Sequence, residues 1–390
     1  MGEKKLVYVD NNATTRVDEE VVHAMQPYFT GLYGNPSSIH SFGGQIAKKI
    51  ADARGQVAEL LGAQDTEIVF TSGGTESDNF AIKGVLEYFP DKKHIVTTKV
   101  EHHAVLSLCD KLAKEGYQVT KLSVDRKGNL DLNELRNSLR DDTAIVSIMY
   151  ANNETGVIFP VEKIGQIVKE RGITFHVDGV QAVGKIPINL KDSPIDLLSL
   201  SSHKYHGPKG IGALYIKRGT RIKPMIVGGH HERGRRAGTE NVPGIIGLAK
   251  ACELAQKYMQ DELTRIKGMR DRLEEKILAR FKNALVNGDR ENRTPNTTNI
   301  SFEYVEGEAI LLYLDERGIA ASSGSACTSG SLEPSHVLRA MGVPFTAAHG
   351  SVRFSLSRFN TDEDVDYILS ELPPIIERLL EISPFGREVL

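Results

Sequence analysis

Cysteine is scarce in this chain of 390 residues, which contains only Cys109, Cys252 and Cys327. No two of them have the CxxC or zinc-finger spacing that would indicate a metal or redox motif. A small, odd number of cysteines argues against a disulfide framework and is typical of a reducing compartment. We therefore expect a cytoplasmic protein.

Long apolar runs and an excess of charge of one sign are also lacking. No apolar run approaches the roughly 20 residues of a membrane span, and residues 1–12 lack the apolar stretch and cleavage-like site of a signal peptide. The formal net charge of −3 argues against bulk binding of nucleic acid. We expect neither a membrane nor a nucleic-acid partner.

The middle of the chain alternates strand-like and helix-like segments. The predicted strands are 67–71, 94–100, 144–151, 173–177, 197–201 and 211–216, and predicted helices begin near residues 76, 104 and 160. This alternation predicts an α/β fold with a mostly parallel sheet flanked by helices. Ligands of such sheets bind outside the carboxyl ends of the strands.

The last third of the chain has a different pattern. A long helical stretch at 244–281 leads to predicted strands at 298–304 and 351–356, with helices at 306–317, 334–341 and 361–381. A chain of this length suits two domains. We predict a large domain over 16–258 and a smaller α+β domain formed by 1–15 and 259–390.

Lys204 follows the apolar strand 197–201 almost directly, with Ser201 and His203 beside it. A lysine at a strand end, close to hydroxyl and imidazole donors, is suited to bind pyridoxal phosphate (PLP) through its amine. Lys204 is therefore the candidate cofactor lysine.

The segment 72–77 links a predicted strand to a predicted helix and contains Gly74 and Thr75. Glycines let the backbone approach an anion, and a helix start directs free N–H groups at it. A Gly-Gly turn before a helix is common by itself. Together with Ser201 and His203, however, it predicts a phosphate-binding site.

Asp178 and Gln181 follow the strand 173–177, and Asn153 follows the strand 144–151. A carboxylate beside the pyridine nitrogen keeps the cofactor ring cationic, and Gln181 could donate a hydrogen bond to its phenolic oxygen. Asn153 could reach that oxygen or a substrate carboxylate. The alternative for Asp178 and Asn153 is an ordinary turn.

His102 follows a third strand, and Arg353 lies in a predicted strand of the small domain. An imidazole stacked on the cofactor could fix its plane and assist proton transfer. A guanidinium could hold an amino-acid carboxylate; Arg358 is a nearby competitor. Adjacent side chains diverge, so His102 and His103 do not predict a metal site.

Cys327 differs from the other two cysteines because small polar residues surround it in the loop 322–330. Cys109 and Cys252 lie in apolar helical segments and are expected to be small buried hydrophobes. A cysteine in a Ser- and Gly-rich loop, about 320–335, is a candidate mobile nucleophile. A structural cysteine is the alternative.

Several motifs recur in a fixed order along nearly the whole chain. They are residues 10–15, 34–38, 71–77, 203–204 and 322–328. With them the chain resembles the cysteine desulfurases of the class-V aminotransferase superfamily, in the group that serves iron–sulfur clusters and nitrogenase. One departure is Gly74, which stands where alanine is common in the family.

The resemblance implies PLP fold type I, with a seven-stranded-type sheet, and a homodimer in which Thr239 acts across the interface. It implies that L-cysteine is converted to L-alanine and that Cys327 carries the sulfur as a persulfide. The sulfur would pass to an iron–sulfur scaffold or another acceptor protein. No resident metal is expected, although Cys327 could ligate an iron–sulfur cluster transiently.

Three alternatives remain open from the sequence. Selenocysteine cleavage and another PLP-dependent class-V transamination would use the same lysine and carboxylate. A non-catalytic assembly scaffold could keep the fold without turnover, but Lys204, Asp178 and Cys327 are all present.

Overall fold

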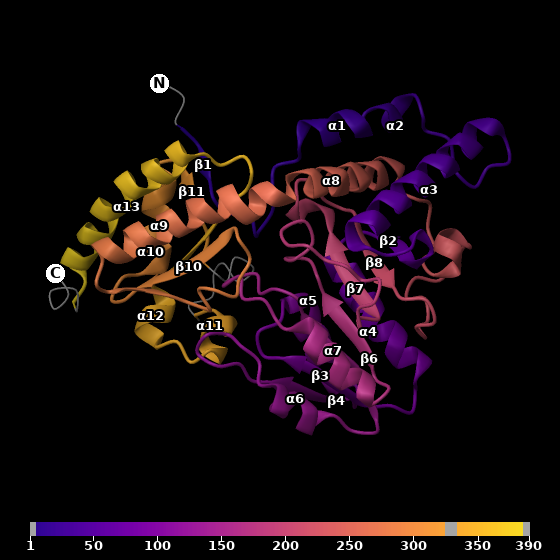
Figure 1. The fold of residues 1–390 in the computed structure, drawn as a ribbon, viewed down its shortest axis with the longest axis horizontal. Coiled ribbons are helices and arrows are strands. Elements are labelled where there is room, and N and C mark those ends of the chain that lie inside the picture. Colours follow the sequence, from indigo (N-terminus) through magenta and orange to yellow (C-terminus); the bar gives the residue numbers. More distant parts are fainter. Residues whose placement is uncertain (1–4, 324–333, 385–390) are drawn as a thin grey trace.

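The computed structural model describes residues 5–323 and 334–384 (Figure 1). Cys327 therefore lies outside the described residues. The strands are β1 (Val7–Tyr8), β2 (Ile68–Thr71), β3 (His94–Thr98), β4 (Gln118–Leu122), β5 (Thr143–Met149), β6 (Thr174–Asp178), β7 (Leu197–Ser201), β8 (Gly212–Ile216), β9 (Ala284–Val286), β10 (Thr297–Phe302), β11 (Ile319–Ala320) and β12 (Ser351–Ser355).

Helices of very different length connect these strands. They are α1 (Glu19–Met25), α2 (Pro27–Thr30), α3 (Ser41–Leu61), α4 (Gly74–Tyr88), α5 (His103–Lys114), α6 (Leu132–Ser138), α7 (Val161–Glu170), α8 (Val242–Asp261), α9 (Lys267–Arg280), α10 (Gly307–Glu316), α11 (His336–Ala340), α12 (Phe345–His349) and α13 (Asp362–Ile382). Among the described helices, none is both long enough and apolar enough to cross a membrane.

The large sheet has seven strands in the order β2-β8-β7-β6-β5-β3-β4. Strands β4, β3, β5, β6 and β7 are parallel, whereas β8 is antiparallel to both β7 and β2. This confirms the predicted mostly parallel sheet. The carboxyl ends of the neighbouring strands β5, β6 and β7 therefore meet at one edge.

Most strands of this sheet are buried on both faces, because helices cover both sides and successive side chains of a strand point to opposite sides; the edge strand β4 is partly exposed. In β7, Leu198 and Leu200 join the apolar cluster under α3, α7 and α8, whereas Leu197 joins the cluster under α4 and α5. Strands buried on both faces read as continuous apolar runs, which is why the pattern located them. The helix α3 and the strand β4 lie outside the predicted elements.

A second apolar cluster is drawn from Val7, Val9 and residues between 266 and 380. It lies around the antiparallel sheet β12-β10-β9 and the helices α9, α10 and α13, on the left of Figure 1. A π turn at Glu262–Ile266 joins α8 to α9 in one helical stretch that leads from one part to the other. The boundary at 258/259, inside α8, remains a prediction.

The N-terminal arm contacts both parts of the molecule. Strand β1 pairs with β11 in parallel, and Asp10 bridges to Ser355 of β12. Helix α1 then packs against α8. The arm therefore passes between the small sheet and the edge where β5, β6 and β7 end.

A buried ion pair holds the loop that precedes β10. Glu274 and Arg293 have side chains only 1% and 2% exposed and lie 2.6 Å apart. Burial alone would raise the pKa of Glu274, but the ion pair with Arg293, together with hydrogen bonds from Thr298 and Arg290, holds it below its usual value. Arg293 bridges to Val157, so this pair supports the loop after β5.

We expect Glu274→Ala to lower the free energy of unfolding by about 3–5 kcal/mol, because it leaves a buried guanidinium without its carboxylate. Urea unfolding followed by circular dichroism measures this. The neighbouring Glu275 is exposed, so Glu275→Ala is the matched control and should change stability by less than about 0.5 kcal/mol. Equal effects of the two substitutions would contradict a stabilising buried pair.

Candidate active site

A cavity of about 390 Å³ lies at the carboxyl ends of β5, β6 and β7. This volume is within the range of small-molecule sites. Its lining contains ten residues predicted from the sequence: Gly74, Thr75, His102, Asn153, Asp178, Gln181, Ser201, His203, Lys204 and Arg353. Segments that are far apart in the sequence are thus brought together at the edge where parallel strands end.

Lys204 ends a 3₁₀ turn, Ser202–Lys204, that follows β7 directly. Its Nζ donates to the carbonyl oxygens of Asn12 (2.7 Å) and Ala13 (2.9 Å). The N-terminal arm therefore holds the amine at the cavity wall. This position suits a lysine that must approach a ligand aldehyde.

Asp178 is the last residue of β6 and is buried. Its Oδ1 accepts a hydrogen bond from the Val180 N–H (3.0 Å). Burial raises the pKa of Asp178 to about 6, while this hydrogen bond and the charge of Lys204 act in the opposite direction. A cationic ring nitrogen at this place would give the carboxylate a partner and stabilise its ionised form.

Two further buried carboxyl groups lie near Asp178 and were missed by sequence reasoning. Burial, followed by the charge of Asp178, raises the pKa of Asp78 well above its usual value. Burial also raises the pKa of Glu101 to about 8, against a hydrogen bond from Thr98. Burial thus raises the pKa of all three carboxyl groups, and the hydrogen bond from Val180 and the charge of Lys204 oppose this rise at Asp178. In the sequence, Asp78 and Glu101 look like ordinary surface charges.

The turn before α4 is shaped for an anion. Gly73 has φ 151°, and within the described residues α4 has no side-chain cap at its N-terminus. A Cβ atom at Gly73 would lie 3.6 Å from the Ser201 Oγ, so the hydroxyl borders the turn. Thr75 and His203 line the same cavity. Free helix N–H groups and hydroxyls are the donors that a phosphate requires.

His102 caps helix α5, and its Nδ1 accepts a hydrogen bond from the Ala104 N–H (3.1 Å). Burial, with the charge of Lys204, lowers the pKa of His102 to about 4. The ring is therefore neutral with its proton on Nε2. This tautomer suits stacking and hydrogen-bond donation, and the expected role of His102 in proton transfer remains a prediction.

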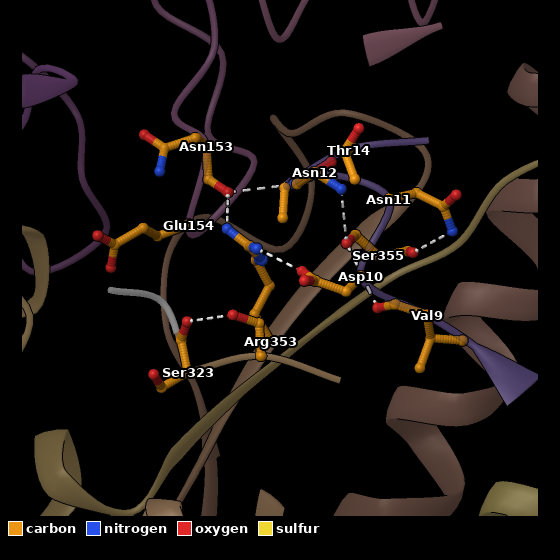
Figure 2. Close-up of polar contacts among 12 residues, drawn as sticks. Val9, Asp10, Asn11, Asn12, Thr14, Asn153, Glu154, Ser323, Arg353 and Ser355 are labelled. Atoms are coloured by element: carbon orange, nitrogen blue, oxygen red, sulfur yellow. Dashed lines mark hydrogen bonds and ion pairs between the residues drawn. The ribbon is translucent and has the colours of Figure 1, made fainter. Parts of the chain in front are cut away.

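Arg353 is 2% exposed and lies between two partners (Figure 2). Its Nη2 forms an ion pair with the Asp10 Oδ1 (2.6 Å), and its Nη1 donates to the Asn153 carbonyl oxygen (2.9 Å). The buried Nε has no hydrogen-bond partner within the described residues. A substrate carboxylate would thus meet a guanidinium whose orientation is already fixed. Arg358 instead pairs with Asp18.

Asn12 is the central polar residue that sequence reasoning assigned no role. Its Nδ2 donates to the Asn153 carbonyl oxygen (3.2 Å) and the Thr297 Oγ1 (2.8 Å), and its N–H donates to the Ser355 Oγ (3.0 Å; Figure 2). It also accepts from Lys204, as above. The only available signal was its place in the motif 10–15.

The cavity lining does not include Thr239, and one further predicted residue is not described. Thr239 lines a separate cavity of about 200 Å³ with Glu232 and Arg236, and Cys327 is outside the described residues. The other cysteines, Cys109 and Cys252, are buried, and burial raises the pKa of each to about 12. Neither is suited to act as a nucleophile.

Known proteins resemble this chain over almost its full length. The family model described as aminotransferase class-V matches residues 7–368. A protein of Trichormus variabilis named cysteine desulfurase 2 is 62% identical over 98% of this chain and 96% of its own length. Cysteine desulfurase NifS of Azotobacter vinelandii is 60% identical over 97% of this chain and 94% of its own length.

Solved structures give the same result. A NifS-like protein superposes with a TM-score of 0.91 at 41% identity, covering 96% of this chain and all of the other. A structure of SspA in complex with cysteine superposes with a TM-score of 0.80 at 35% identity, covering 91% of this chain and all of the other.

The turn before α4 generates a prediction, because a Cβ atom at Gly74 would lie 2.7 Å from the Val180 Cγ2. We expect Gly74→Ala to cost about 1–3 kcal/mol of stability by overpacking. It should also weaken PLP binding, since the Val180 N–H holds Asp178. Thermal unfolding and a PLP titration followed by absorbance measure the two effects.

Adding Val180→Ala to Gly74→Ala should restore both properties, because it removes the clashing methyl group. Gly44→Ala is the matched control: its Cβ would have no neighbour within 4 Å. This control should be neutral or slightly stabilising. If Gly74→Ala bound PLP as tightly as the wild type, the added methyl group would not displace Val180 and Asp178, and the prediction would be wrong.

Proposed function

The chain belongs to the class-V aminotransferase family and, within it, to the cysteine desulfurases, and we propose that the cavity around Lys204 converts L-cysteine to L-alanine and delivers the sulfur to Cys327. One observation carries the proposal. A lysine, a buried carboxylate, a neutral imidazole and an uncapped helix terminus line one cavity. That donor set fits PLP, on which this family of enzymes depends.

Each group of the cofactor has a matching residue in the cavity. Lys204 would bind the aldehyde carbon, Asp178 would pair with the ring nitrogen, and His102 would cover the ring face. Gln181 would donate to the phenolic oxygen. The phosphate would lie at the start of α4, where Gly74, Thr75, Ser201 and His203 supply donors. When bound, PLP supplies an electron sink that stabilises negative charge on the substrate Cα.

The protein's own residues would orient the substrate and move its protons. Arg353 would hold the carboxylate with Asn153 beside it, which fixes the Cα–H bond relative to Lys204. Lys204 is then the base that removes this proton, since the tautomer of His102 is fixed by its helix cap. Lys204 can later return a proton to form alanine.

Cys327 would accept the sulfur atom. Its thiolate attacks the substrate sulfur, so that an S–S bond forms and the substrate C–S bond breaks. The products are alanine and a persulfide on Cys327, and no external oxidant is needed. The described residues on either side of 324–333 support this assignment. Before it, the backbone of Ser322 pairs with that of Arg353, and after it, His336 lines the cavity.

We also propose a homodimer in which Thr239 completes the phosphate site of the partner subunit. Support comes from the segment around it. Glu232 and Arg233 have φ values of 48° and 57°, and the buried atoms Arg235 Nη1 and Glu240 Oε2 have no hydrogen-bond partner within the described chain. Strained backbone and unsatisfied buried polar groups cluster at functional sites, and Glu232 and Glu240 line the same cavity as Thr239. A second chain at this cavity could supply the missing partners.

The persulfide would pass to an acceptor protein, for which an iron–sulfur scaffold is our first proposal. The free, buried state of Cys109 and Cys252 supports a cytoplasmic location. Selenocysteine cleavage and transamination would use the same cavity but would not require Cys327. The relatives at 60–62% identity favour the desulfurase.

The first prediction concerns Cys327. With L-cysteine and a thiol reductant, the PLP-loaded wild type should release sulfide and alanine in equal amounts, and Cys327→Ala should abolish both. The control is Cys109→Ala, which removes a buried thiol and should keep turnover. Alanine that forms at the wild-type rate without Cys327 would exclude the proposed sulfur transfer.

The second prediction concerns Thr239. Lys204→Ala should be inactive, and Thr239→Ala should bind PLP weakly. Subunits of the two variants, unfolded and refolded together, should recover about a quarter of the wild-type activity, because half of the dimers are mixed and each has one intact site. No recovery on mixing would place Thr239 in the site of its own subunit.

A further inference from the structure

A second lysine is buried beside the cavity and has no role in the chemistry described above. Lys185 lies in the turns that follow β6 and is 4% exposed. Its Nζ donates to the Gln181 Oε1 (2.6 Å) and the Asn12 Oδ1 (2.8 Å). A buried lysine is costly unless its partners are well placed, so these contacts indicate a specific task.

The first contact fixes the orientation of the Gln181 amide. Its oxygen accepts from Lys185, and its Nε2 donates to the Asn12 carbonyl oxygen (3.0 Å). Only one orientation of the Gln181 amide satisfies both neighbours: its oxygen must face the donor Lys185, and its Nε2 must face the carbonyl oxygen of Asn12. This leaves Gln181, which lines the cavity, with an N–H group to offer a ligand.

The second contact links Lys185 to Lys204 through one residue. The Asn12 Oδ1 accepts from Lys185 and from the Asn296 Nδ2 (3.1 Å), while the Asn12 carbonyl oxygen accepts from Lys204 (2.7 Å). Lys185 therefore holds the side chain of Asn12, and the main-chain carbonyl of Asn12 holds Lys204. A shift of Asn12 would move the acceptors of both Gln181 and Lys204.

The surroundings of Lys185 are charged as well as buried. A small cavity behind Lys204 is lined by Lys185, Glu262 and Arg358. Burial, followed by the charge of Lys204, lowers the pKa of Lys185 to about 7; Glu262 raises it and Arg353 lowers it. Protonated Lys185 and protonated Lys204 repel each other, so each ammonium group disfavours the charged form of the other.

We propose that Lys185 is a positioning residue of the active site, which holds Gln181 as a hydrogen-bond donor and fixes Asn12 against Lys204. The inference rests on the proposed PLP site. Loss of Lys185 removes the donor to the Gln181 Oε1 and a donor to the Asn12 Oδ1, so only the Asn12 carbonyl oxygen still orients the Gln181 amide, and Asn12 itself is held less firmly. An amide that turned its oxygen toward the phenolic oxygen of the cofactor would place two acceptors together, where they repel. The effect should therefore appear in the spectrum of the bound cofactor.

The test compares Lys185→Met with the wild-type holoenzyme. We expect a shifted absorbance maximum of bound PLP, a changed pH dependence of that absorbance, and a kcat lowered by about tenfold to hundredfold. The KM for L-cysteine should change less than kcat, because Lys185 makes no hydrogen bond to Arg353 or Asn153. Lys169→Met is the control: Lys169 forms a partly buried ion pair with Asp196, and its loss should alter stability but not the spectrum.

A double-mutant cycle tests the route through Gln181. Gln181→Met should reproduce the spectral shift, and Lys185→Met should add little to it, since both substitutions remove the same hydrogen bond. If Lys185→Met does not yield folded holoenzyme, Lys185→Gln replaces it. An amide can face Gln181 with either its oxygen or its N–H, so it no longer fixes the orientation, and the same shift is expected.

Two results would overturn the inference. One is a Lys185 variant with the wild-type spectrum and kcat, whatever its melting temperature. The other is full additivity of the Lys185 and Gln181 effects. A wild type that shows no bound-PLP absorbance, or no alanine formation dependent on Cys327, would instead refute the proposed function and is distinguishable from both.

Discussion

The attachment of the N-terminal arm to Lys204 is the contact on which the rest of the site depends. Main-chain carbonyl oxygens of Asn12 and Ala13 accept from the lysine amine, and the side chain of Asn12 reaches Thr297 in the small sheet. The arm thus connects the reacting amine to the part of the molecule that carries Arg353. This link adds to the direct contact between Arg353 and the Asn153 carbonyl oxygen in fixing the cofactor-binding groups relative to the substrate-binding groups, and alignment of reacting groups is a large part of catalysis.

The sheet supplies the second constraint. Neighbouring parallel strands end at one edge of the sheet. The pairing of β5, β6 and β7 is therefore enough to bring together the residues that follow them. Asp178 and Ser201 are the last residues of their strands. Because β8 runs antiparallel to β7, the next turn brings Gly212 back to the same edge, where a Cβ would lie 2.7 Å from Gly73.

Buried charge gives the site its chemical character. Asp178, Asp78 and Glu101 are withdrawn from water, and burial raises the pKa of each. Burial lowers the pKa of His102 and Lys185 instead. Low dielectric surroundings thus favour the neutral forms of these five groups, and a cationic cofactor ring beside Asp178 would be a stabilising partner for its carboxylate. Such concentrations of shifted groups are typical of active sites.

The sequence by itself determined the mostly parallel sheet and ten residues of the cavity, because apolar runs mark buried strands and polar residues follow their ends. The motifs also identified the family. Only the tertiary structure decided which charges are buried: Lys185, Asp78 and Glu101 resemble surface residues until the fold covers them. It also decided the partners of Lys204 and Arg353, which lie 192 and 343 residues away in the chain. Pairings at such distances depend on how whole elements pack, and no local pattern encodes them.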